Sequence, residues 1–240
     1  MPSIQFGTDV ISYQINYSAK RKNLSIQVDE NGVTVIAPKT ASEEEIQSIL
    51  KQKVIWILKQ QAYFSEIEHY ENPRKFLSGE KLPYLGRQYR LKVHQEAIEK
   101  ASFIYRQGRF IAYVPNHLPE DEYRNTLYPL YKEWIIQRGS LIAAERIKRF
   151  QQFYPYSPKK VIIKDQQQRW GSCTANEQVL LNWHIFLAPM SAIDYVIAHE
   201  LAHLKVMDHS NAFWETLAMV YPEYQVSKEW LRLNGRKLYI

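Results

Sequence analysis

Cysteines and long apolar runs are both scarce in this sequence of 240 residues. The longest apolar stretches, such as residues 54–58, are far shorter than the roughly 20 residues that a transmembrane helix needs. The first residues alternate polar and apolar side chains, so we expect neither a membrane span nor a secretory leader. The single cysteine, Cys173, excludes an internal disulfide bond and fits a reducing compartment. The expected location is therefore the cytoplasm.

Acidic residues are fewer than basic ones, 25 against 31, which gives a formal net charge of +6. A positive charge favours anionic partners such as DNA or nucleotides. The basic residues are spread along the chain and form no single block, so a generally basic surface is the simpler interpretation. DNA or nucleotide association stays open as an alternative.

The apolar content of 45% is enough for a hydrophobic core, and its periodicity predicts an α+β fold. Residues 24–37 alternate apolar and polar side chains around Asn31-Gly32, which predicts a β-hairpin. Ser42 and Glu45 form a capping box ahead of a long helix. The apolar positions of that helix include Ile46, Ile49, Leu50, Ile57 and Leu58.

Strands are predicted over residues 76–115, where glycines and a proline separate short alternating runs. A helical period returns over residues 119–150, and a polar middle between two apolar runs then predicts a β-ribbon that ends at Pro189. We expect a β-rich amino-terminal region with one long helix over residues 1–117 and a second domain over residues 118–240. The residues expected to be buried on the 119–150 helix are Leu127, Leu130, Trp134, Leu141 and Ile142.

Residues 196–214, VIAHELAHLKVMDHSNAFW, contain three of the seven histidines of the chain. The segment follows Ser191 and Asp194, which mark a helix start. His199 and His203 are four residues apart, so on a helix they present imidazole nitrogens to one point. Glu200 leans toward the same point without ligating and can take a proton from a metal-bound water. Zinc suits this pattern because it accepts imidazole ligands and an open fourth position.

A third protein ligand is needed for a catalytic zinc site, and His209 is the leading candidate. The helix must then end near Lys205, because a continued helix would turn His209 away from the other two histidines. Ser210 can cap a new helix after the turn. Glu215 and Glu223 are the alternative third ligands.

A segment of about 50 residues resembles the YgjP-like metallopeptidase family, whose relatives are the SprT-like and WLM zinc proteases. The motifs that carry the resemblance are RWGSC at residues 169–173, LNW at residues 181–183, the histidine motif, and Phe213-Trp214. The resemblance implies a zincin-like catalytic domain over residues 118–240, built from a β-ribbon and the HExxH helix. It also implies zinc bound by His199, His203 and His209, with Glu200 as the general base.

The leading functional hypothesis is a zinc-dependent metallopeptidase that acts on a peptide or protein substrate. His184, Arg169 and Tyr195 are candidate donors to the oxyanion, and Cys173 is a less favoured fourth zinc ligand that would close the site. Two rivals remain. One is a zinc-dependent hydrolase of nucleotide phosphoanhydrides, although no glycine-rich phosphate loop is evident. The other is a non-enzymatic nucleic-acid-binding module whose metal only stabilises the fold.

Overall fold

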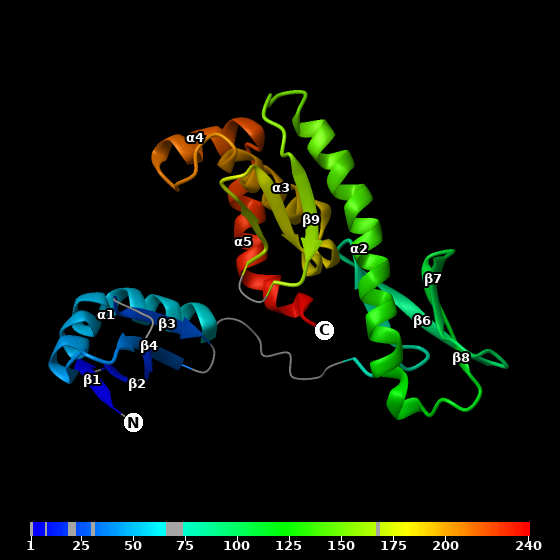
Figure 1. The fold of residues 1–240 in the computed structure, drawn as a ribbon, viewed down its shortest axis with the longest axis horizontal. Helices are drawn as coiled ribbons and strands as arrows, with labels where there is room; N and C mark the ends of the chain where they lie inside the picture. The colour runs from blue at the N-terminus through cyan, green and yellow to red at the C-terminus, as the bar shows by residue number, and fades with distance from the viewer. Residues whose placement is uncertain (1, 8, 19–22, 30–31, 66–73, 167–168) are drawn as a thin grey trace. The chain divides into compact units, whose positions relative to one another are not determined.

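The computed structural model describes residues 2–7, 9–18, 23–29, 32–65, 74–166 and 169–240. Within these ranges the chain forms five α-helices and three small β-sheets (Figure 1). In the same part of the chain, no helix combines the length and the apolar character needed to cross a membrane. The chain divides into two compact units, Met1–His69 and Tyr70–Ile240. The predicted mixed α+β architecture is confirmed.

The first unit is a four-stranded sheet packed against one long helix (Figure 1). The predicted hairpin pairs β3 with β4 in antiparallel fashion, while Asn31 lies outside the described residues. The Ser42 hydroxyl accepts a hydrogen bond from the Glu45 amide at 3.2 Å, so the predicted helix cap forms. Buried Ile46, Leu50 and Ile57 on the helix join the core. The strands, in the spatial order β1-β2-β4-β3, and the helix are β1 (Ser3–Phe6), β2 (Asp9–Ser18), β4 (Gly32–Pro38), β3 (Ser25–Asp29) and α1 (Glu43–Ser65).

Aromatic side chains join the first sheet of the second unit to a long helix. Phe110 on the sheet lies 5.5 Å from Tyr131 and 5.2 Å from Trp134 on the helix, measured between ring centroids. Phe110 and Tyr131 are both fully buried. The sheet has the strand order β5-β6-β8-β7, and a 3-10 turn, η1, precedes the helix. These elements are β5 (Lys81–Tyr84), β6 (Arg87–Glu96), β7 (Ser102–Arg106), β8 (Arg109–Pro115), η1 (Glu120–Glu122) and α2 (Tyr123–Phe150).

The boundary between the units lies earlier in the chain than the one that we expected between residues 117 and 118. Strands β5 to β8 share one hydrophobic core with α2 and with the carboxy-terminal helices, so they belong to the second unit. The expected amino-terminal region therefore contains one complete unit and the first sheet of the next. Periodicity identifies single elements, but it carries no information on which elements share a core.

The rest of the second unit is a three-stranded sheet followed by three α-helices. The two apolar runs of the predicted ribbon become β9 and β11, but they pair in parallel, and the segment between them adds β10, which pairs with β11 in antiparallel fashion. Strand β10 is at one edge, because the strand order is β10-β11-β9. The elements are β9 (Lys160–Lys164), β10 (Gly171–Cys173), β11 (Gln178–Asn182), η2 (Trp183–Leu187), α3 (Met190–His203), α4 (Asn211–Val220), α5 (Tyr224–Asn234) and η3 (Gly235–Leu238).

Helix α3 is held by contacts at its start and along its length. The Gly86 amide, in the turn between β5 and β6, donates to the Leu187 carbonyl at 2.9 Å. A Cβ on Gly86, whose φ is 74°, would lie 2.8 Å from atoms of Pro189, so only glycine fits there. Farther along α3, Asp194 accepts two hydrogen bonds from Arg146 of α2. These contacts fix the helix on which the histidine motif lies.

Candidate metal centre

The chain leaves the helical path immediately after the second histidine of the motif. Helix α3 ends at His203, two residues before the expected end near Lys205. The Asp208 carboxylate then accepts a hydrogen bond from the Ser210 amide at 3.1 Å, and α4 begins at the next residue with Ser210 as its N-cap. This short loop returns His209 toward α3.

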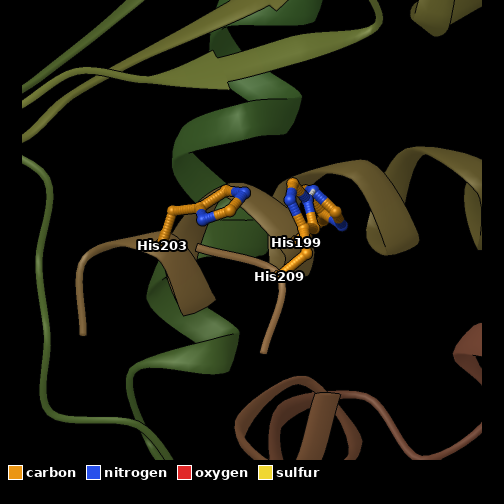
Figure 2. A group of neighbouring side chains, drawn as sticks. All are labelled: His199, His203 and His209. Carbon is orange, nitrogen blue, oxygen red and sulfur yellow. Dashed lines mark hydrogen bonds between the residues drawn. The ribbon is translucent and has the colours of Figure 1, made fainter. Parts of the chain in front are cut away.

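Three imidazoles converge where the loop folds back (Figure 2). One ring nitrogen from each of His199, His203 and His209 lies within 4.8 Å of the other two, and His199 Nε2 is 3.1 Å from His209 Nε2. Two nitrogens bound to one tetrahedral zinc ion at 2.0–2.1 Å would be about 3.3 Å apart. The group contains neither Glu215 nor Glu223, the alternative ligands, within the described residues.

Hydrogen bonding at the histidines fits the binding of a metal ion. His203 Nδ1 lies 3.0 Å from the Val206 carbonyl oxygen, so Nδ1 carries the proton and Nε2 keeps a free lone pair. Histidines that bind metals commonly donate their other ring N–H to such a carbonyl. His199 Nδ1 is buried and has no partner in the part of the chain that the structure describes. Burial, followed by the charges of His203, His209 and Lys228, lowers the pKa of His199 to about 3, which keeps its imidazole neutral.

The Phe213 side chain of α4 packs against all three histidines. The Phe213 ring is fully buried and its centroid lies 4.4 Å from that of His203 and 4.8 Å from those of His199 and His209. Phe213 therefore restricts the orientations of all three imidazoles. His209 is the exposed member of the group, so the centre opens toward solvent on its side.

Glu200 follows His199 on α3 and carries a buried carboxylate, with only 4% of its surface exposed. Burial raises the pKa of Glu200 to about 8, while the Arg169 guanidinium and a hydrogen bond from the Cys173 backbone amide act in the opposite direction. Within the described residues, Glu200 Oε2 has no hydrogen-bond partner. Strand β10 approaches the carboxylate closely, because a Cβ on Gly171 would lie 2.6 Å from Glu200 Oε1. One oxygen of Glu200 is thus left free while the strand confines the side chain.

The cysteine beside the centre has the properties of a buried thiol. Burial, together with the charges of Glu200 and Glu177, raises the pKa of Cys173 to about 11. The thiolate that would bind zinc is therefore disfavoured, and Cys173 is not in the histidine group of the described residues. Its backbone amide, and not its sulfur, is the atom that contacts the site.

Comparison with known proteins decides the family. A model of the YgjP-like metallopeptidase domain matches residues 22–234, which is most of the chain. The chain belongs to the YgjP-like metallopeptidase family. No curated protein matches it. Among solved structures, the metallopeptidase zymogen of Pyrococcus abyssi abylysin matches with a TM-score of 0.35 and 19% identity over 37% of this chain and 90% of that chain.

Membership of the YgjP-like family confirms the resemblance predicted from the motifs and implies a bound metal ion.

The three candidate oxyanion donors lie in different surroundings. His184 is buried, with its Nδ1 3.0 Å from the Asn182 side-chain oxygen. Arg169 acts electrostatically on Glu200, and the Tyr195 ring lies 5.8 Å from that of His199. Arg169 and Tyr195 are thus the candidates that interact with Glu200 or His199 among the described residues.

Proposed function

We propose that this YgjP-like protein is a zinc-dependent peptidase in which His199, His203 and His209 bind the ion and Glu200 is the general base. The observation that carries the proposal is the convergence of three imidazole nitrogens, with a buried carboxylate on the residue that follows the first of these histidines. Three histidine ligands suit zinc and leave a fourth position open for water or substrate. Zinc held there would supply a Lewis acid for the peptide carbonyl and lower the pKa of a bound water to about 7.

Glu200 moves the proton in the proposed reaction. In its ionised form, Glu200 takes a proton from the attacking water with its unpaired Oε2 and then gives that proton to the amine of the leaving product. The Cys173 amide and the close approach of Gly171 hold the carboxylate in place meanwhile. Arg169 or Tyr195 stabilises the oxyanion that develops on the carbonyl oxygen.

The edge strand favours a peptide, rather than a small anion, as the substrate. Among the described residues β10 pairs with β11 alone, so its other edge offers backbone groups to an extended peptide, except for the Cys173 amide, which Glu200 accepts. Gly171 and Cys173 on this strand also contact Glu200, which brings a peptide paired with β10 close to the general base. This combination of an edge strand and an HExxH helix is the zincin-like arrangement that we propose for the second unit.

Metal content is the direct test of the proposed ligands. We expect about one zinc per chain in the wild type after loading and dialysis, and in Glu200→Gln, but none in His203→Ala, which lacks one of three ligands. Elemental analysis measures this. Glu215→Gln is the matched control, because Glu215 is exposed and outside the histidine group. Wild-type protein without bound metal would refute the proposal.

Gly171→Ala tests whether β10 positions the general base. The added Cβ would lie 2.6 Å from Glu200 Oε1 and 2.8 Å from its Cγ, so the side chain must move. We expect kcat for peptide hydrolysis to fall about 100-fold, with KM and zinc content little changed, because misplacing a catalytic group by 1 Å has an effect of that order. The measurement is steady-state kinetics. The control is Ser172→Ala, which lies on the same strand and adds no bulk. Activity within twofold of wild type would show that Glu200 does not depend on this contact.

A further inference from the structure

Lys228 on α5 is a cation that an aromatic side chain holds in place. Its Nζ lies 4.4 Å from the centroid of the Trp214 ring, within the range of a cation–π interaction. The Tyr224 ring, one helical turn earlier on α5, stacks on the same Trp214 ring at 5.7 Å with an interplanar angle of 24°. The Lys228 side chain therefore lies along α4 at a defined place.

That place is next to the candidate metal centre. The Trp214 ring centroid lies 5.9 Å from that of His209 and 6.3 Å from that of His199. The charge of Lys228 also reaches His199, where it adds to the larger effects of burial and the neighbouring histidines. A substrate bound at the centre would therefore pass within reach of the ammonium group.

The Lys228 ammonium is exposed and forms no ion pair with a carboxylate of the described residues. The adjacent Glu229 carboxylate is bound by the Arg232 guanidinium at 2.8 Å. Arg169 is a second exposed cation, and its charge acts on Glu200. The charged groups that act on the histidines are thus Lys228 and the exposed Asp208, and the one that acts on Glu200 is Arg169.

An ammonium group fixed on an aromatic ring, with no internal counter-ion, is suited to an anionic group of the bound substrate. We propose that Lys228 binds a carboxylate of the peptide substrate, and that the enzyme therefore prefers acidic peptides to neutral ones. This inference rests on the proposed peptidase function and adds a substrate class to it. The carboxylate belongs either to an acidic side chain near the cleaved bond or to the carboxy-terminus of the peptide.

The test uses zinc-loaded full-length protein and one fluorescence-quenched peptide. The peptide is made with Glu, Gln or Lys at each position near the cleaved bond, and with a free or an amidated carboxy-terminus. We expect the wild type to show kcat/KM about fivefold higher for the carboxylate form at one position, the factor of an exposed ion pair. Lys228→Gln removes this ratio, and Lys228→Glu inverts it in favour of Lys. Lys148→Gln, an exposed lysine at the end of α2, keeps the wild-type ratio.

Binding provides a second measurement that does not depend on turnover. Fluorescence anisotropy of labelled Glu and Gln peptides is measured with Glu200→Gln, and again with Lys228→Gln added. We expect the first protein alone to prefer the Glu peptide, with a preference that declines in 0.5 M salt because an exposed charge pair is screened.

Each outcome has a separate meaning. The inference is supported if the kcat/KM ratio of carboxylate to neutral peptides depends on Lys228. If this holds only for side-chain carboxylates, or only for the free carboxy-terminus, the result also identifies which carboxylate Lys228 binds. Equal loss of cleavage for Glu and Gln peptides in Lys228→Gln overturns it, because Lys228 then acts on the reaction itself. An unchanged Glu-to-Gln ratio in that variant overturns this inference and leaves the peptidase proposal standing. If the wild type cleaves no peptide and binds both forms equally, the proposed function falls as well.

Discussion

Replacing Glu200 by glutamine is expected to lower kcat for peptide hydrolysis by about 10²- to 10⁴-fold, the range that a general base contributes. Glutamine has the size of glutamate but cannot take a proton from water. The histidine group is untouched, so we expect the variant to keep its zinc. The measurement is kcat on a cleaved peptide with the zinc content determined on the same sample.

Two companion variants make this result specific to the proton transfer. Glu200→Asp keeps a carboxylate but withdraws it from the position next to β10, so we expect intermediate activity. Glu177→Gln removes an exposed carboxylate that also acts on Cys173, and we expect it to behave like the wild type. Full activity in Glu200→Gln would contradict the assigned role. Loss of zinc from that variant would instead place Glu200 among the ligands.

The histidine group could be predicted from the sequence because its members are close along the chain. Helical geometry alone places His199 and His203 on one face, and the residues between them and His209 allow a turn. The structure brings the three together through a loop of the expected kind, although α3 ends two residues earlier than we expected. Phe213 lies in the same segment and in one of the family motifs, but its packing on all three imidazoles was not predicted.

The individual contacts that distant segments make with Glu200 and near the histidines were not predicted. Gly171 and the Cys173 amide reach Glu200 from β10, and Lys228 reaches the centre from α5. No periodic pattern encodes these approaches, since they depend on how the sheet packs against α3. A glycine whose absent side chain makes room for a catalytic group has no local signal that distinguishes it from a turn glycine.

Helix α2 shows how prediction of burial failed within a correctly predicted helix. Leu127 and Ile142 are buried as predicted, but Leu141 is 62% exposed. Tyr131, which we did not select, is fully buried because its hydroxyl donates a hydrogen bond to the Pro83 carbonyl. A tyrosine whose hydroxyl is hydrogen-bonded can be buried in the core as fully as a leucine. A hydrophobicity scale, which ranks leucine above tyrosine, does not predict this.

Replacing Arg146 by alanine is expected to destabilise the second unit by about 3–5 kcal/mol, the usual result of removing one partner of a buried ion pair. The Arg146 and Asp194 side chains are 13% and 9% exposed, and two hydrogen bonds of 2.5 Å join them. Alanine would leave the Asp194 carboxylate buried on α3 without its counter-ion. Urea unfolding followed by tryptophan fluorescence is a suitable measurement, because five of the six tryptophans lie in residues 70–240.

A surface pair and a double variant separate the loss of pairing from the loss of packing. Lys159 and Glu177 lie 3.0 Å apart with side chains 71% and 49% exposed, so Lys159→Ala is expected to change the free energy of unfolding by less than about 1 kcal/mol. Arg146→Met combined with Asp194→Leu removes both charges and keeps the volume, and we expect stability close to wild type. If Arg146→Ala were no worse than Lys159→Ala, the pair would not fix α3. In that case the connection of α3 to α2 would rest on the apolar packing of the second unit, including that of the preceding η2, whose Phe186 ring would lie 2.7 Å from a Cβ added to Gly139 of α2.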